Sequence, residues 1–403
     1  MRRGIHSLFT GIVSGVLLFA LTGCSARDGT LKREDMFTLD IGRLEGEIDL
    51  YNDLTNGQGQ KSSIAMTDGL FYISNSAGQK ITRYNSYGDL LFMIFNAETN
   101  PPLLDLQIID EMTPAITRWA ISYPLQNPGA IAIDSKKHVF AADRLTSDRH
   151  SYDKENDILY DSILLHFDAN GKFIEYLGRQ GLGGSPFPHI EHIYVSLNDD
   201  IAVVSRIGND FIVYWFSPDG VLLYEIPFKS SSIPALENRE ELLVLLDGIA
   251  IAPDEKIIYI KADYYREVFD TATETRSGTI PDGCSLWLYS IDGNRYIGEA
   301  EIPFYENTTR INGRRSSEEL FYTMLGVLGN REVVFCFPVA TGYSILSLNA
   351  DESARQRKYG FIDVDPSELE YSDFTLSSNG IISALLSTEW EAKVVWWRTD
   401  MLR

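Results

Sequence analysis

The chain has 403 residues, of which 44% are hydrophobic and 12% aromatic, enough apolar material for one large folded domain or two. Its formal net charge of −22 excludes nucleic acid as a partner, because affinity for nucleic acid comes from a basic face. The same charge is repelled by anionic lipid, so membrane attachment would need something other than basic residues. Abundant tyrosine and phenylalanine, with few helix-like windows, predict an all-β protein.

The N-terminus has the pattern of a secretory signal peptide. Arg2 and Arg3 precede an apolar run that ends in Leu-Thr-Gly-Cys24. This ending resembles the bacterial lipobox, and the resemblance implies cleavage of residues 1–23 and a lipid, with palmitate as a typical acyl chain, on Cys24. An uncleaved signal anchor with an incidental cysteine is the alternative. Lipidation predicts a protein of the bacterial cell envelope, on the periplasmic or outer-membrane side, with residues 24–35 as a polar tether.

Short apolar segments joined by tight turns recur along the rest of the chain. In residues 129–177, two hairpins turn at Ser-Lys-Lys and Ala-Asn-Gly. Similar units of four strands recur at intervals of several tens of residues, which indicates a β-propeller. The predicted propeller spans 36–403 and has six four-stranded blades, at about 62–95, 129–177, 193–227, 248–302, 320–361 and 372–398.

The two ends of this repeat pattern fit together. The last unit, at 372–398, lacks its outer strand, whereas residues 36–41 form a strand that belongs to no unit. Pairing the two would close the ring and protect an edge that would otherwise be exposed. We therefore expect the N-terminal strand to complete the last blade.

The repeat unit resembles the NHL family. The resemblance rests on Gly-Ala-Ile-Ala-Ile-Asp at 129–134 with Phe-Ala-Ala-Asp at 140–143, and in part on Gly-Ile-Ala-Ile-Ala at 248–252. With the lipobox, the chain is similar to the propeller-type lipoproteins of spirochaetes. That resemblance implies a six-bladed ring and says little about activity.

All long insertions are predicted to lie on one face of the ring. Turns between the first and second, and between the third and fourth, strands of each unit are short and define the plain face. The other connections define the decorated face, and they contain the long segments 96–127, 144–162, 229–247, 263–284 and 305–319. Aromatic residues in these segments are candidate interaction residues, with packing onto the ring as the alternative: Trp119, Tyr152, Tyr160, Tyr264 and Tyr265. A short helix is expected near 110–119.

No catalytic, cofactor-binding or metal-binding residue is assigned. His189 and His192 flank Glu191, but a strand would place the two histidines on opposite sides. Asn127, Glu191 and Asp247 precede inner strands, where oxygen ligands can collect Ca²⁺, although such residues more often cap loops. Cys284 and Cys336 are expected to be separate buried thiols.

These observations predict a lipid-anchored binding or scaffold module that leans away from enzyme activity. Its decorated face would recognise a protein or a glycan, and Cys24 would attach it to the membrane. The alternative is a metal-dependent lactonase or esterase, or an enzyme acting on glycans, which should gather carboxylates or histidines at the mouth of the central channel.

Overall fold

The computed structural model describes residues 29–50, 60–109, 117–236, 242–311, 314–351 and 356–403. The predicted signal peptide, Cys24 and most of the predicted helix near 110–119 lie outside these residues. Among the described residues, no helix is long and apolar enough to cross a bilayer.

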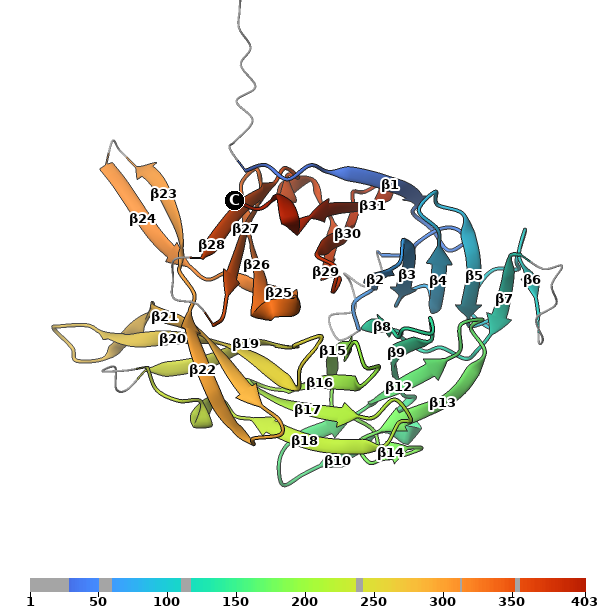
Figure 1. Cartoon of the computed structure of the whole chain (residues 1–403), viewed down its shortest axis with the longest axis horizontal. Helices are drawn as coiled ribbons and strands as arrows, with labels where there is room; N and C mark the ends of the chain where they lie inside the picture. The colour runs from blue at the N-terminus through green and yellow to red at the C-terminus, as the bar shows by residue number, and fades with distance from the viewer. Residues whose placement is uncertain (1–28, 51–59, 110–116, 237–241, 312–313, 352–355) are drawn as a thin grey trace, which may run out of the picture.

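Antiparallel sheets are arranged in a ring, so the predicted all-β propeller is confirmed (Figure 1). Five blades consist of strands that follow one another in the chain. From the centre outward, the first blade consists of β2 (Ser63–Thr67), β3 (Leu70–Asn75), β4 (Lys80–Tyr84) and β5 (Leu90–Phe95), and the second of β8 (Ile131–Ile133), β9 (Val139–Arg144), β12 (Ser162–Phe167) and β13 (Phe173–Gly178). The third consists of β15 (Ile190–Val195), β16 (Ile201–Ile207), β17 (Asp210–Phe216) and β18 (Leu222–Phe228), and the fourth of β19 (Leu243–Ile251), β20 (Ile257–Phe269), β21 (Arg276–Ser290) and β22 (Arg295–Glu301). The fifth consists of β25 (Thr323–Val327), β26 (Glu332–Val339), β27 (Gly342–Asn349) and β28 (Arg357–Ile362).

The remaining four-stranded sheet joins the two ends of the chain. β29 (Tyr371–Leu376), β30 (Ile381–Ser387) and β31 (Glu391–Arg398) are completed by β1 (Glu34–Asp40), which pairs antiparallel with β31. This is the pairing predicted from the missing outer strand. The predicted count of six blades is corrected to five blades that are continuous in the chain, and the sheet of β29–β31 with β1 closes the ring.

The turn residues explain why the hairpins are tight. At the β2–β3 turn, Asp68 and Gly69 both have positive φ, as a two-residue hairpin turn requires. The hydrophobic clusters lie between neighbouring sheets: Trp215 of β17, for example, is buried in the same cluster as Ile260 of β20. Each sheet therefore depends on its neighbours for burial.

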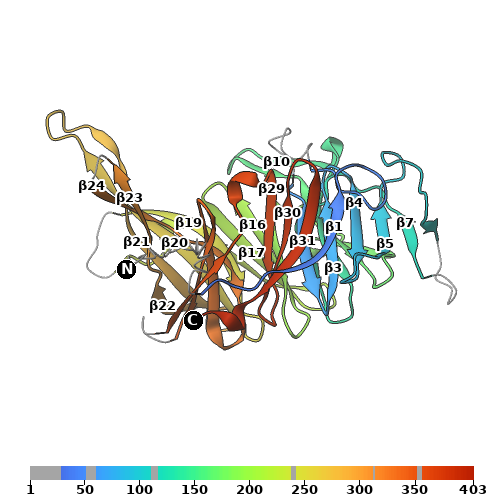
Figure 2. The ribbon, with the colours of Figure 1, turned by 90° about the horizontal axis from the view of Figure 1, so that it is seen from above.

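The insertions add strands on the decorated face. β10 (Ser151–Asp153) and β11 (Ile158–Tyr160) form a hairpin between β9 and β12, and β23 (Tyr305–Ile311) and β24 (Arg314–Leu320) form another between β22 and β25. Figure 2 shows β23–β24 projecting from the upper side of the ring, the same side as β10. The segment 263–284, predicted as a long insertion, is instead an extension of β20 and β21, which pair from Ile257 to Phe269.

Other short elements complete the rim. β6 (Gln107–Ile108) and β7 (Trp119–Ser122) lie parallel to β5 outside the first blade, and β14 (Gly181–Leu182) pairs with β13. Single turns of 3₁₀ helix are η1 (Ser147–Arg149), η2 (Ser230–Ser232), η3 (Gly329–Arg331), η4 (Pro366–Glu368) and η5 (Thr399–Met401).

Candidate functional site

Towards the decorated face, a cluster of polar and charged residues lies at the start of β15, at the end of β16 and within β19, β20 and β21. We call these residues the mouth cluster: Glu191, Arg206, Asp247, Lys261, Asp263 and Cys284. The guanidinium of Arg206 forms a two-point ion pair with Glu191 and donates from Nη2 to the carbonyl oxygen of Asp247, 3.0 Å away on the next sheet. The cluster therefore fastens two neighbouring blades together.

Lys261 lies at the centre of this cluster. Its side chain is 0% exposed, and Nζ is 3.0 Å from Oδ2 of Asp247 and 2.6 Å from Oδ1 of Asp263. Burial by itself lowers the pKa of Lys261, but the interactions with Cys284, Asp247 and Asp263 outweigh it and raise the pKa above its ordinary value. The lysine is therefore a permanent cation in the interior, held by two acids from different strands.

Cys284 completes the mouth cluster. Its thiol donates to Oδ1 of Asp263 at 3.0 Å, and burial raises the pKa of the thiol well above its ordinary value. Cys284 and Cys336 are both free and buried, as the sequence predicted. A buried thiol with a raised pKa is a weak nucleophile, so Cys284 acts as a hydrogen-bond donor in this cluster.

The histidines predicted as possible ligands do not form a metal site with their neighbours. The backbone carbonyl of His189 accepts from the N–H of Arg206, and the ring of His192 packs beside Tyr194. Both side chains are exposed to solvent. Within the described ranges, no group of three or more His, Cys, Asp or Glu side chains is arranged to hold a metal ion.

The three residues considered for a channel Ca²⁺ have other partners. Oδ1 of Asn127 accepts from the N–H of Gln60 at 2.6 Å, whereas Glu191 pairs with Arg206 and Asp247 pairs with Lys261. Each polar side chain therefore closes a loop or an ion pair, which is the capping role left open by the sequence.

The predicted interaction aromatics divide into two groups. Trp119 and Tyr264 are buried: Trp119 stacks on Phe92, and Tyr264 accepts from the indole N–H of Trp287 at 2.8 Å. For these two residues the alternative of packing onto the ring holds, because Trp119 lies in a strand added to the first blade and Tyr264 lies where β20 still crosses the ring.

The other three predicted aromatics remain accessible on the decorated face. Tyr152 is exposed at the β10–β11 hairpin and donates its hydroxyl to Asp157, and Tyr160 lies under the guanidinium of Arg179, 3.8 Å from the ring centroid. Tyr265 is half-buried at the base of the β20–β21 arm. Only Tyr265 borders the mouth cluster.

Tyr265 belongs to an aromatic group that sequence reasoning missed. Its ring packs edge-on against Phe321 at 5.2 Å between centroids, and Phe321 also contacts Phe304 at 5.3 Å. Nζ of Lys261 lies 5.6 Å from the Phe321 centroid. These aromatics link the base of the β20–β21 extension and the base of the β23–β24 hairpin to the mouth cluster. Phe304 and Phe321 flank an insertion in the sequence, so only the folding of β23–β24 back on itself brings them together.

The extended β20–β21 hairpin and β19 present an apolar face, which we call the arm surface: Leu243, Leu245, Tyr265 and Phe269. Leu243 is the cross-strand partner of Tyr265, and Leu245 is that of Asp263, so by register Leu243, Leu245 and Tyr265 lie on one side of the sheet. Phe269 ends the same strand, β20, further out on the arm. Leu243, Leu245 and Phe269 are exposed, and Phe269 is 54% accessible. Exposed apolar groups that share one side of a projecting arm are typical of a binding surface.

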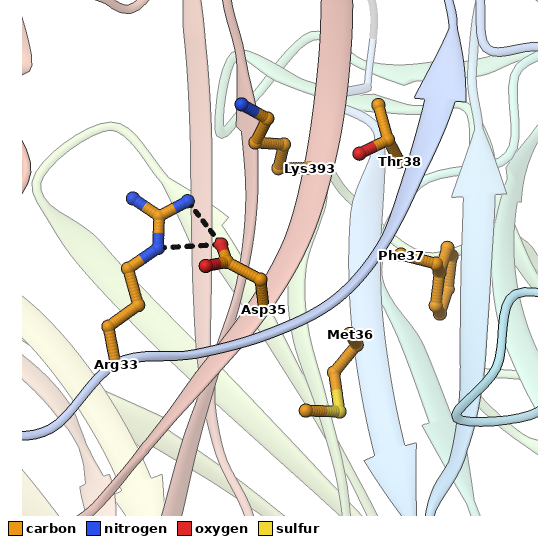
Figure 3. A pocket seen from close by; sticks show the side chains of 6 residues that line it. All are labelled: Arg33, Asp35, Met36, Phe37, Thr38 and Lys393. Atoms are coloured by element: carbon orange, nitrogen blue, oxygen red, sulfur yellow. Dashed lines mark hydrogen bonds and ion pairs between the residues drawn. The ribbon is translucent and has the colours of Figure 1, made fainter.

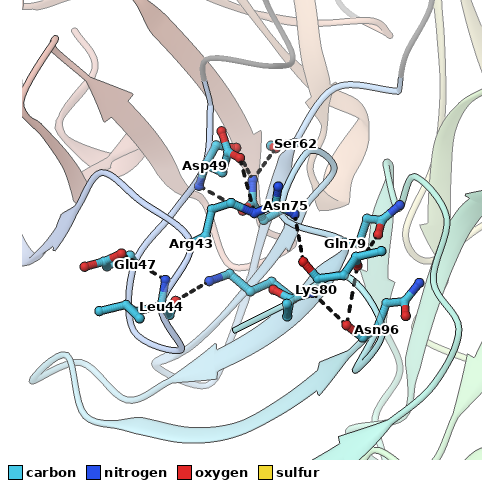
Figure 4. A network of polar contacts seen from close by, with 11 residues as sticks. Arg43, Leu44, Glu47, Asp49, Ser62, Asn75, Gln79, Lys80 and Asn96 are labelled. Atoms are coloured by element: carbon cyan, nitrogen blue, oxygen red, sulfur yellow. Dashed lines mark hydrogen bonds and ion pairs between the residues drawn. The ribbon is translucent and has the colours of Figure 1, made fainter. Parts of the chain in front are cut away.

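A second polar network fixes the connection between β1 and β2 (Figure 4). The side chain of Asn75 accepts from the N–H of Asp49 at 2.9 Å and donates to Ser62 Oγ at 3.1 Å. Lys80 donates to the carbonyl of Leu44, and burial lowers the pKa of Lys80 to about 8. These contacts hold residues 41–50 against the decorated face.

A groove of about 470 Å³ lies on the outer edge of the ring, between β1 and β31 (Figure 3). It is lined by Arg33, Asp35, Met36, Phe37, Thr38 and Lys393. Nε of Arg33 donates to Asp35 at 2.8 Å within this lining. The groove is open to solvent and lies away from the mouth cluster.

Asp143 is a buried carboxylate that clamps the connection leading into β8. It accepts from the N–H groups of Gln126, Asn127 and Arg144, the shortest at 2.7 Å. Burial nevertheless raises the pKa of Asp143 from 3.8 to about 7. Asp373 on β29 accepts from the N–H of Ile64 at 2.9 Å, and burial raises its pKa to about 6.

We expect Asp143→Asn to remove a pH-dependent part of the stability. Between pH 3.8 and about 7 the folded protein keeps a proton on Asp143 that the unfolded chain has released. The stability that this proton contributes is therefore fully present at low pH and is lost as pH rises toward 7. Over this range the free energy of unfolding falls by at most about 4 kcal/mol on account of Asp143. Urea unfolding of both proteins from pH 4 to 8 should show the wild type losing its advantage over the variant. A difference that stays constant across this range would contradict the assignment.

Comparisons with known proteins do not assign the chain to a family. No family model matches the chain, and no curated protein matches it. Among solved structures, it is similar to hydrazine synthase of Kuenenia stuttgartiensis, with 10% identity over 84% of this chain and 95% of that chain at a TM-score of 0.42. It is also similar to the polysaccharide lyase Uly1, with 10% identity over 92% and 99% of the two chains at 0.41. An ulvan lyase matches at 11% identity over 90% and 84%, with a TM-score of 0.39. Likenesses this weak carry no argument about activity.

Proposed function

We propose that this protein is a lipid-anchored binding module of the bacterial cell envelope, which holds a partner on the decorated face of its propeller. The arm surface is the observation that carries the proposal, because its exposed apolar side chains project from a folded sheet beside the mouth cluster. Attachment through a lipid on Cys24 is supported by the signal-peptide pattern and the resemblance to a lipobox.

A protein partner fits the arm surface better than a glycan does. Two of its four residues are leucines, and aliphatic side chains complement apolar protein surfaces, whereas sugars stack on aromatic faces. The charged groups of the mouth cluster are paired with one another, so they are engaged in holding the blades. The enzyme alternative gains no support from the described residues, where no set of three metal-ligating side chains meets.

We expect the double variant Leu245→Ser with Phe269→Ser to lose its partner. Each apolar side chain buried in an interface contributes about 1.5–3 kcal/mol, so the two together weaken binding by roughly a hundredfold or more. Both residues are exposed, so the fold should be unaffected. The measurement is the amount of partner co-purified with the native lipoprotein from solubilised membranes.

The matched control is Leu197→Ser with Val221→Ser, two exposed residues on turns of the plain face. The control should retain its partner. Equal capture by both double variants would overturn the arm surface as the binding site. Cys24→Ala should separately move the protein out of the membrane fraction and abolish its labelling with palmitate, and unchanged fractionation would overturn the lipid anchor.

A further inference from the structure

Both ends of the described chain are attached to one strand, β28. The N–H of Leu31 donates to the carbonyl of Phe361 at 2.8 Å, and the N–H of Phe361 donates to Gly29 at 3.1 Å. Two residues earlier on β28, the N–H of Tyr359 donates to the carbonyl oxygen of Arg403, the C-terminal residue, at 2.7 Å. The chain therefore becomes part of the fold at Gly29, on the outer rim of the ring.

The tether is shorter than the sequence predicted. Residues 24–35 were expected to be free of the ring, yet Leu31 is buried with Ile362 and Leu402, and β1 begins at Glu34. Only residues 25–28 separate Cys24 from Gly29, where the described fold begins. A chain from residue 24 to 29 spans at most about 18 Å even when fully extended, so an anchor on Cys24 keeps this part of the rim close to the bilayer.

Exposed apolar and basic side chains surround this point, and we call them the rim patch: Lys32, Tyr359, Met401 and Arg403. Tyr359 is 47% accessible and Met401 is 53% accessible. Tyr359 and Arg403 are joined by backbone hydrogen bonds, and Lys32 follows the buried Leu31. Tyrosine suits the boundary between water and lipid, because its ring is apolar and its hydroxyl remains hydrated.

Charge around the rim patch is balanced, unlike the chain as a whole. Lys32 pairs with Glu34, Arg33 with Asp35, and Arg398 with Asp400. The rest of the protein must therefore carry most of the net charge of −22. A neutral, partly apolar rim can approach anionic headgroups with less repulsion than the acidic remainder of the surface.

We propose that the rim patch rests on the phospholipid bilayer, with Tyr359 and Met401 at the level of the headgroups. This inference rests on the lipid anchor proposed above. It orients the propeller by its rim at β28 and the C-terminus, so that β23–β24 and the arm surface stay accessible to a partner.

The test uses the mature lipoprotein, reconstituted into vesicles of phosphatidylethanolamine and phosphatidylglycerol. A fluorescent label is attached to Met401→Cys, to Tyr359→Cys, or to Tyr152→Cys on the decorated face as the matched control. Cys284 and Cys336 are buried with raised thiol pKa values, so they should not react with the label. Brominated lipid should quench the labels at positions 401 and 359 at least threefold more than the label at position 152.

Equal quenching at all three positions would overturn the proposed orientation. Mass spectrometry of the N-terminal peptide and the recovery of protein with the vesicles test the anchor itself. A lipidated, vesicle-bound protein without selective quenching would refute the rim patch alone. A protein that lacks the lipid and stays in solution would refute the anchor, and with it the basis for the rim patch.

Discussion

Leu39→Asp should destabilise the propeller by about 3–5 kcal/mol, because it detaches the strand that joins the two chain ends. Leu39 on β1 is buried in a cluster that includes Phe71 of the first blade and Val394 of β31. A carboxylate there loses the apolar burial of leucine and has no cation to pair with in that cluster. Freeing β1 would also expose the edge of β31, which invites aggregation.

Thr38→Asp is the matched control for this substitution. Thr38 lies on the same strand but is exposed, and its cross-strand partner is Lys393. We expect it to change the free energy of unfolding by no more than about 0.5 kcal/mol. Trp396 on β31 donates its indole N–H to Glu34 of β1 at 3.0 Å, so tryptophan fluorescence during urea unfolding reports on this contact. Equal urea midpoints for the two variants would show that β1 is not integral to the ring.

Ring closure could be predicted from the sequence because it depends only on the number of strands in the last unit and at the N-terminus. Strand-and-turn patterns at 372–398 give three strands, and residues 36–41 give one strand without a partner. Apolar alternation and Gly- or Asn-containing turns are local properties, so they survive in a single sequence. The structure confirms this pairing, with Leu39 opposite Ala392 and Asp40 opposite Glu391.

The arms could not be predicted in the same way. Beyond Tyr264, the strand β20 continues as Tyr-Arg-Glu-Val-Phe, and its partner segment in β21 is rich in Gly, Thr and Pro. These residues have no core to alternate against, so the pattern resembles a loop. The extension arises because the two strands already pair inside the ring and continue to hydrogen-bond beyond it.

Burial of Trp119 and assembly of the mouth cluster depend on contacts between distant segments. The indole N–H of Trp119 donates to the carbonyl of Asn170, which lies on a turn of the next blade. Lys261 lies in an apolar run that predicts a strand. The residues around it in the sequence do not predict that Asp247, on the neighbouring strand, is its partner. Such pairings follow from the register of the sheets, which single-sequence patterns determine only to within a few residues.

Lys261→Met should be the second strongly destabilising substitution, again by about 3–5 kcal/mol, because it leaves the buried carboxylate of Asp263 and the half-buried carboxylate of Asp247 without their cation. Asp263 is already hard to ionise, since burial raises its pKa even with Lys261 beside it. Without the ammonium group, Asp263 should take up a proton more readily. The loss of stability should therefore be larger at pH 8 than at pH 5, where the folded variant can neutralise Asp263. Urea unfolding at the two pH values measures this difference.

Lys393→Met provides the control, because Lys393 pairs with Glu391 at 2.7 Å but both side chains are exposed. Such a surface pair contributes about 0–1 kcal/mol, so little change is expected at either pH. The triple variant Lys261→Met, Asp247→Asn, Asp263→Asn should recover much of the lost stability, because no uncompensated charge then remains in the interior. If Lys261→Met is as stable as Lys393→Met, the mouth cluster does not hold the blades together. If it is destabilised and also loses its partner, the cluster positions the arm surface, since Lys261 itself is inaccessible to any partner.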